Sequence, residues 1–164
     1  MAGDRLAFER LYRHHERTVH ALLLSMLPPE DARDGVQEVF LSALRSIATV
    51  SEPARFGAWL ASIARNAARD ALRRRRPEHG MGDEEPAASE RAPSVDSRDE
   101  AARILACLRE LPEAYRESLS LRLVEGMGGP EIAVRLGLTP GSVRVNLCRG
   151  MKLLRARLAE EGIA

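Results

Sequence analysis

Two helices separated by a tight turn, near the carboxyl end, constrain this chain more than any other stretch. Residues 130–136 have the spacing of a short amphipathic helix, residues 137–139 form a turn, and a longer helix begins at Pro140. Two helices joined by a three-residue turn that contains glycine are typical of the helix-turn-helix. Residues 139–158 carry five cations and no acid. A basic second helix behind a tight turn favours binding in the major groove of DNA.

Charge is unevenly distributed along the chain. Residues 1–76 have 13 arginines and 9 acids, residues 77–100 have 2 arginines and 8 acids, and residues 101–164 have 10 basic residues and 7 acids. The three stretches therefore carry formal charges of +4, −6 and +3, which give the net charge of +1. Two basic ends around an acidic middle indicate that both ends meet a polyanion.

Apolar residues recur at three- and four-residue steps through most of the sequence, and no stretch has the alternation of a strand, so we predict an all-α fold. The first helix is expected at about residues 4–26, the second from Pro29, and the third at about residues 53–75. Trp59 is expected in the core more than on the surface. The second helix is expected to bury Val36, Val39, Phe40, Ala43, Leu44 and Ile47.

Proline, glycine, serine and acids interrupt this periodicity after Arg76. Such a composition predicts a flexible, self-repelling linker at residues 77–96. Helical spacing resumes afterwards and leads into the helix-turn-helix. We therefore expect two small helical domains, residues 1–76 and residues 97–164, on either side of an acidic linker.

Several protein classes are disfavoured by what the sequence lacks. No apolar run approaches the length of a membrane span, and the first residues lack the layout of a signal peptide, so we expect a cytoplasmic protein with no membrane insertion. Cys107 and Cys148 have no metal or disulfide spacing and are expected to be buried or half-buried free thiols. His14 and His15 should point to different helix faces, which disfavours a metal site. We expect no cofactor and no enzymatic activity.

Two motifs point to a family. Residues 31–41, DARDGVQEVFL, and residues 59–76, WLASIARNAARDALRRRR, resemble the second conserved region of bacterial sigma factors. Residues 111–126, LPEAYRESLSLRLVEG, with the helix-turn-helix that follows, resemble the fourth region. Two such domains joined directly by a short linker are the layout of the extracytoplasmic-function (ECF) group of the sigma-70 superfamily.

The resemblance implies a promoter-specificity subunit of RNA polymerase. It implies that the first domain binds the clamp helices of the core enzyme, through an exposed row on the second helix: Asp34, Gln37, Glu38 and Leu41. It also implies that the third helix recognises the minus-ten element and holds the opened strand. Arginines four residues apart share a face of that helix and can track phosphates, and two polar neighbours add hydrogen-bonding capacity. The candidate minus-ten residues are Arg65, Asn66, Arg69, Asp70 and Arg73.

The same resemblance places the second domain on the polymerase flap, with its last helix in the minus-thirty-five element. The candidate residues there are Ser142, Arg144, Asn146, Arg149 and Lys152. Arg144 can form two hydrogen bonds with guanine and Asn146 two with adenine, each pair contributing ~1–3 kcal/mol of discrimination. Gly35 and Gly150 are unusual inside helices, since each costs about 1 kcal/mol relative to alanine.

Other interpretations remain open. The arginine face of the third helix is also what a solvated surface looks like, and Asp70 is equally placed to pair with Arg73 or Arg74. A stand-alone helix-turn-helix regulator is the alternative function, and it predicts specific DNA binding without polymerase. An anti-sigma factor is a further candidate partner of the chain, besides core polymerase and promoter DNA.

Overall fold

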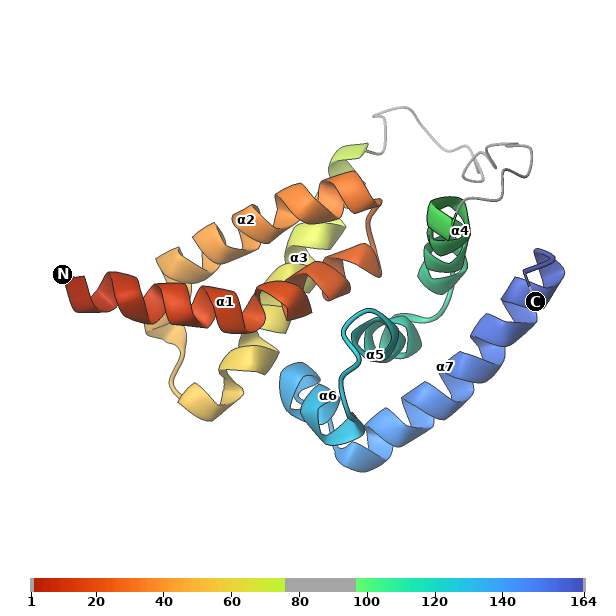
Figure 1. Ribbon diagram of the computed structural model, residues 1–164. Coiled ribbons are helices and arrows are strands. Elements are labelled where there is room, and N and C mark those ends of the chain that lie inside the picture. Colours follow the sequence, from red (N-terminus) through yellow and green to blue (C-terminus); the bar gives the residue numbers. More distant parts are fainter. Residues whose placement is uncertain (1, 76–96, 164) are drawn as a thin grey trace.

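The computed structural model of this chain describes residues 2–75 and 97–163 (Figure 1). Every regular element in these two stretches is helical, so the all-α prediction is confirmed for the described residues; the predicted linker at residues 77–96 lies outside them. The first stretch forms α1 (Ala2–Leu24), α2 (Pro29–Ser46), two 3-10 turns (Ile47–Thr49 and Pro53–Arg55) and α3 (Phe56–Arg75). The second forms α4 (Ser97–Arg109), α5 (Glu113–Leu123), α6 (Gly129–Leu136) and α7 (Pro140–Glu160).

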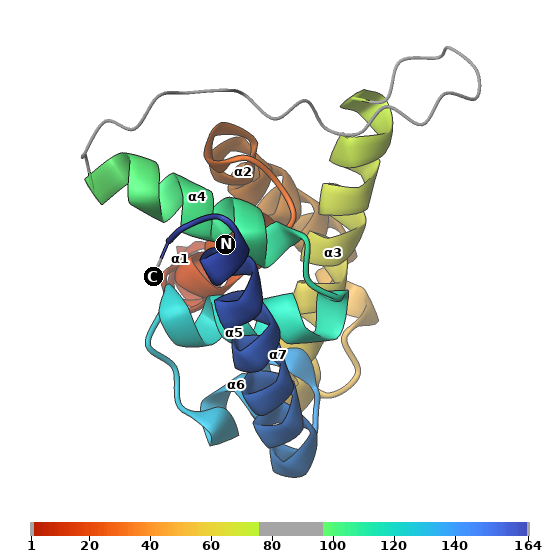
Figure 2. The same cartoon turned by 90° about the vertical axis from the view of Figure 1, so that its right-hand side faces the viewer.

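The two halves of the chain pack directly against one another. Helices α1–α3 form one bundle and α4–α7 the other, with α5 against α1 and α6 against α3 (Figures 1 and 2). One apolar core crosses this contact, because Leu23 and Leu60 belong to the same buried cluster as Leu121, Ile132 and Leu136. A smaller cluster under α7 is confined to the second half. The sequence did not predict how the two halves are arranged. In the structure they pack together in a closed arrangement.

Backbone chemistry explains the turn between α6 and α7. Gly137 ends α6 with a φ of +68°, a left-handed conformation that glycine adopts without steric cost. Thr139 precedes α7 and its Oγ1 accepts a hydrogen bond from the Ser142 backbone N–H at 3.1 Å. Pro140 follows as the first helical residue, where its missing N–H is not needed. The predicted helix-turn-helix is therefore present.

Close helix packing accounts for the two unusual glycines. A Cβ atom on Gly35 would lie 3.1 Å from the Leu23 Cδ1 atom of α1. A Cβ atom on Gly150 would lie 3.0 Å from both the Leu119 Cδ1 atom and the Tyr115 Cβ atom of α5. The helix propensity lost at these positions is thus offset by a closer approach of neighbouring helices.

Replacing Gly150 with leucine is expected to lower the free energy of unfolding by about 1–3 kcal/mol, because the new side chain overpacks the contact with α5. Gly141 offers a matched control on the same helix, since the nearest atom to its added Cβ is the Thr139 Oγ1 atom at 3.9 Å. Gly141→Leu should leave stability unchanged or raise it by up to about 1 kcal/mol through helix propensity. Denaturant unfolding checks both values, and equal stabilities of the two variants would contradict the role assigned to Gly150.

Candidate nucleic-acid and polymerase interface

The predicted minus-ten residues lie along one side of α3, but their surroundings differ. Asn66, Asp70 and Arg73 are exposed. Asp70 forms an ion pair with Arg73 one turn away, as the second interpretation of its role predicts. Asn66 and Arg73 are therefore placed to meet a ligand from solvent.

The other two arginines of this row face the second half of the chain. Arg65 donates from Nε to the Glu117 Oε1 atom at 2.6 Å and from Nη2 to the Oε2 atom at 3.1 Å. Arg69 donates from Nη2 to both carboxylate oxygens of Glu113, at 2.7 and 3.0 Å. The side chains of Arg65 and Glu117 are only 21% and 6% exposed. This pairing joins residues 52 positions apart and was not visible in the sequence.

A cavity of about 480 Å³ lies beside these ion pairs, between α3, α5 and the helix-turn-helix. Its lining includes Asn66 from α3 and Leu138 and Asn146 from the helix-turn-helix, besides the paired arginines and glutamates. Asn146 is half-buried, and its Nδ2 donates to the Ser118 Oγ atom at 3.4 Å. Among the predicted minus-thirty-five residues, Asn146 is thus turned toward α5 in this arrangement.

The remaining predicted residues of α7 form an exposed basic surface. Arg144, Arg149 and Lys152 are all exposed, and Ser142 is exposed while bonded to Thr139. Val145 and Cys148 share this surface, which the sequence prediction missed. Cys148 is exposed, so the expectation that both cysteines are buried or half-buried holds for Cys107 alone. Helical spacing could have found both, because Cys148 lies four residues after Arg144 and Val145 lies four residues before Arg149, and residues four apart share a face.

The predicted polymerase-binding row on α2 is exposed in full: Asp34, Gln37, Glu38 and Leu41. Leu41 is 53% exposed, and the exposed apolar surface continues along α2 to Leu44, which is 49% exposed, and to Ile47 just beyond the helix. The prediction that Leu44 and Ile47 belong to the buried stripe is wrong, because none of the described helices covers their side of α2 as α1 and α3 cover the side with Val36, Val39 and Ala43. Adjacent exposed leucines on an otherwise polar face are typical of a protein-binding surface.

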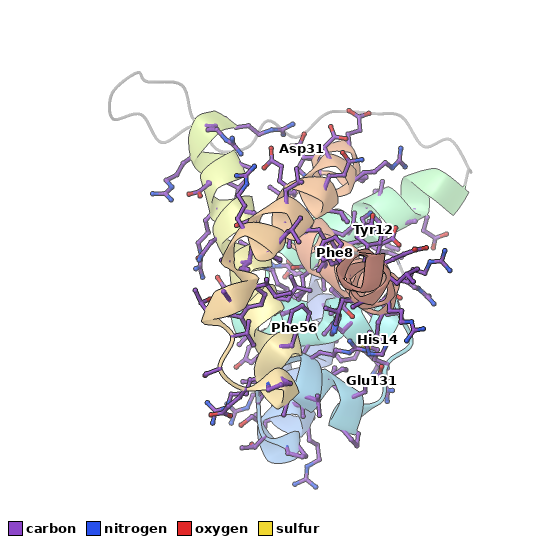
Figure 3. The ribbon with its side chains drawn as sticks, turned by 90° about the vertical axis from the view of Figure 1, so that its left-hand side faces the viewer. Phe8, Tyr12, His14, Asp31, Phe56 and Glu131 are labelled. Carbon is purple, nitrogen blue, oxygen red and sulfur yellow. The ribbon has the colours of Figure 1, made fainter. Side chains whose placement is uncertain are left out.

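Arg135 on α6 joins the halves at a second point. Its Nη1 donates to the His15 Nδ1 atom at 2.7 Å, and its Nη2 to the His14 Nε2 atom at 3.0 Å. Figure 3 shows His14 from α1 close to Glu131 from α6, which also approaches Arg135. The two histidines were expected to point apart, but both reach one guanidinium. The residues that the structure describes contain no group of three metal-ligating side chains.

The buried position of His15 strongly perturbs its pKa. Burial, with further contributions from the charges of Arg135 and His14, lowers the pKa from 6.5 to about 4. The side chain is only 7% exposed and packs against Phe56 at a ring-centroid distance of 5.1 Å. The imidazole is therefore neutral at physiological pH and accepts the hydrogen bond from the guanidinium.

Acidification is expected to weaken the folded chain through His15. The unfolded chain takes up this proton below pH 6.5 while the folded chain resists it until about pH 4, so the stabilisation present above pH 6.5 is lost between these values. Unfolding measured at a series of pH values checks this prediction. His15→Gln keeps a neutral acceptor and should show a shallower loss over the same range. An identical pH profile for the variant would show that His15 is not responsible.

The helix-turn-helix and the basic residues of α3 and α7 are typical of a helical DNA-binding protein. Comparison with known families agrees. The family Sigma-70 region 2 matches residues 11–78, and the family Sigma-70, region 4 matches residues 101–154. RNA polymerase sigma factor CarQ of Myxococcus xanthus is 36% identical over 96% of this chain and 92% of its own length. ECF RNA polymerase sigma factor SigM of Mycobacterium tuberculosis is 34% identical over 97% of this chain and 79% of its own.

Solved structures agree with the sequence matches. CnrH, in its complex with the cytosolic domain of CnrY, is 29% identical and superposes with a TM-score of 0.65, covering 97% of this chain and 92% of that one. RpoE of Bartonella quintana, at 19% identity and a TM-score of 0.60, shares the fold. The chain belongs to the sigma-70 family, in its ECF group. It is a promoter-specificity subunit that directs RNA polymerase to initiate transcription. None of the described helices has the length and apolarity needed to cross a membrane.

Proposed function

We propose that the two halves of this sigma factor divide promoter recognition between them. Residues 1–76 bind the clamp helices of core polymerase through α2 and the minus-ten element through α3. Residues 97–164 rest on the flap and bind the minus-thirty-five element through α7, and residues 77–96 connect the halves. The observation that carries this division is the chemistry of the exposed faces, because α2 presents acids and leucines, whereas α3 and α7 present arginines.

Charge and shape support each assignment. Arginines along α3 suit a phosphate backbone, and the neighbouring Asn66 amide suits a base edge. Arg144, Arg149 and Lys152 give α7 a cationic face for the major groove. The α2 row carries Asp34 and Glu38 beside exposed leucines, and this combination fits a protein surface better than DNA, which repels acids.

We also propose the setting in which the chain works. It acts in the cytoplasm, where its polymerase acts, and has no catalytic activity of its own. CnrH is found in complex with the cytosolic domain of CnrY. By this similarity we propose that an anti-sigma factor regulates the present chain as well.

Reconstituted initiation tests the proposal. Core polymerase from the source bacterium, with and without the chain, is supplied with genomic fragments, and the start sites of the RNA products are mapped. We expect discrete start sites only when both proteins are present, and weak, unspecific DNA binding by the chain alone. Tight, site-specific binding by the free chain without specific initiation would instead indicate a stand-alone regulator.

Val145 adds an apolar side chain to the candidate minus-thirty-five surface. Its side chain is 41% exposed on α7 beside Arg144, where it can contact the methyl group of a thymine in the major groove. Replacing thymines of the minus-thirty-five element with deoxyuridine removes only these methyl groups. At the thymine that Val145 contacts, we expect this replacement to lower initiation about fourfold, because burying one methyl carbon contributes about 0.8 kcal/mol. Val145→Ala should abolish the dependence on that methyl, and an undiminished dependence would exclude Val145.

A further inference from the structure

We infer that Glu113 and Glu117 of α5 hold the free chain in a closed form that occupies Arg65 and Arg69 on the minus-ten face of α3. This inference rests on the proposed role of α3 in binding the minus-ten strand. The free chain then binds that strand weakly, because the two halves must separate before Arg65 and Arg69 can exchange these carboxylates for DNA phosphates. The acidic side chains of α5 act as an internal substitute for phosphates.

The geometry of the ion pairs supports a substitution for phosphate. Arg65 presents Nε and Nη2 to the two oxygens of Glu117, at 2.6 and 3.1 Å, which is the paired arrangement that arginine also forms with phosphate. Arg69 contacts both oxygens of Glu113. A guanidinium edge that is occupied by a carboxylate cannot bind a second anion in the same way. With only 21% of the Arg65 side chain exposed, a nucleic-acid strand has no access to it in this arrangement.

The amino-terminal part of α3 is covered by the helix-turn-helix. A Cβ atom on Gly137 would lie 2.9 Å from the Ala58 Cβ atom, closer than two such atoms approach in proteins. A Cβ atom on Gly57 would lie 3.6 Å from the Arg135 Cα atom. The turn between α6 and α7 therefore sits directly on α3. Both DNA-binding halves contribute to the covered surface.

Contacts away from α3 stabilise the same closed form. Ser120 on α5 donates a hydrogen bond to the Ala21 carbonyl on α1, and Arg109 Nε donates to the Leu24 carbonyl at 3.2 Å. Arg17 on α1 pairs with Glu125 at 2.7 Å. Together with the Arg135 contact and the shared apolar core, these interactions hold α5 beside α3. The α5 carboxylates are therefore present at a high effective concentration near the α3 arginines. The apparent affinity for DNA is reduced by the fraction of molecules that are open.

A binding experiment on the full-length free chain tests the inference. The probe is a short fluorescein-labelled single-stranded DNA of mixed sequence, because contacts from arginine to phosphate do not depend on base identity. Glu113→Gln with Glu117→Gln removes both carboxylate charges and keeps the side-chain size. The matched control is Glu110→Gln with Glu160→Gln, since both of these glutamates pair with Arg157 inside the second half.

Relative to the control, the Glu113/Glu117 variant should bind the probe about tenfold more tightly, because a larger fraction of molecules is open. Its affinity should also depend more steeply on salt, by about 1.4 in the slope of log K against log salt, or about 0.7 for each arginine released to phosphate. Core polymerase should reduce the difference in DNA affinity between the Glu113/Glu117 variant and the control, because on this inference it holds the halves apart in both proteins. Equal affinities and equal salt slopes for the two variants would overturn the inference.

A second variant separates opening from a general change in charge. Arg135→Met removes a cation and the contacts with His14 and His15, without touching the α5 acids. Simple electrostatics predicts weaker DNA binding by this variant, whereas opening predicts tighter binding. Weaker or unchanged binding would count against the closed form. Retained helicity, measured by circular dichroism, confirms that each variant is folded.

A third comparison distinguishes failure of this inference from failure of the proposed function. Arg65→Ala with Arg69→Ala, added to the Glu113/Glu117 variant, should remove the gain in DNA affinity. A gain that survives would show that the strand binds elsewhere, which overturns the assignment of α3 and the inference together. The inference alone would be overturned by two results together. The Glu113/Glu117 variant would show no gain in DNA affinity, and replacing Arg65 and Arg69 in the polymerase complex would still abolish promoter opening.

Discussion

Association with core RNA polymerase is expected to weaken at least ~100-fold when Leu41 and Leu44 are both replaced with aspartate. Burying one leucine contributes ~1.5–3 kcal/mol, and a carboxylate placed in an apolar contact adds a desolvation cost. Both side chains are about half exposed in the free chain, so its free energy of unfolding should change little. Fluorescence titration of the labelled chain with core enzyme gives the affinity, and denaturant unfolding gives the stability.

Leu6→Asp provides the control, because Leu6 is an exposed leucine on α1 at 59% exposure, outside the α2 row. It should leave core affinity within about twofold of the original chain, since no contact with polymerase is assigned to it. Unchanged core affinity in the Leu41/Leu44 variant would remove α2 from the interface. A large loss of stability in that variant would place the two leucines in the core of the protein instead.

Promoter opening should fall by at least ~100-fold when Arg65, Arg69 and Arg73 are all replaced with alanine. Each charge-assisted hydrogen bond to phosphate contributes ~1.5–3 kcal/mol, and three are lost together. Core affinity should persist, because these side chains lie on α3 and not on the α2 row. The measurement is permanganate footprinting of the opened strand by the polymerase complex, alongside the core titration.

The control for this triple variant replaces three exposed arginines of the same half with alanine: Arg10, Arg13 and Arg33. It carries the same change in charge, so any general electrostatic effect appears in both proteins. Comparable losses of promoter opening in the two triple variants would mean that the α3 face has no specific role. Arg65 has an additional consequence, because its removal leaves the buried Glu117 carboxylate without its partner and should favour the open form.

Local sequence patterns predicted the helices and the exposed row of α2. The helix-turn-helix follows from Gly137, Thr139 and Pro140, whose conformational preferences act within one turn of the chain. The exposed row of α2 follows from three- and four-residue spacing. Both predictions depend on interactions between near neighbours, which the sequence displays directly.

Features that depend on distant segments were not predictable. Leu44 continues the apolar spacing of α2, but its burial depends on whether another helix packs on that side of α2, and none of the described helices does. Asn146 has the chemistry of an adenine contact, yet α5 turns it toward Ser118. The pairing of Arg65 with Glu117 brings together two charges that look solvated in isolation. Each of these required the packing of one half against the other.

Promoter preference measured on a randomised library tests the division of recognition most directly. The templates carry random bases at both the minus-ten and minus-thirty-five positions, and transcripts made by core polymerase with each variant of the chain are sequenced. Replacing Arg144 and Arg149 with alanine should relax base preference only at minus-thirty-five, and replacing Asn66 and Arg69 should relax it only at minus-ten. Relaxation at the opposite element, or at both elements with either variant, would contradict the account.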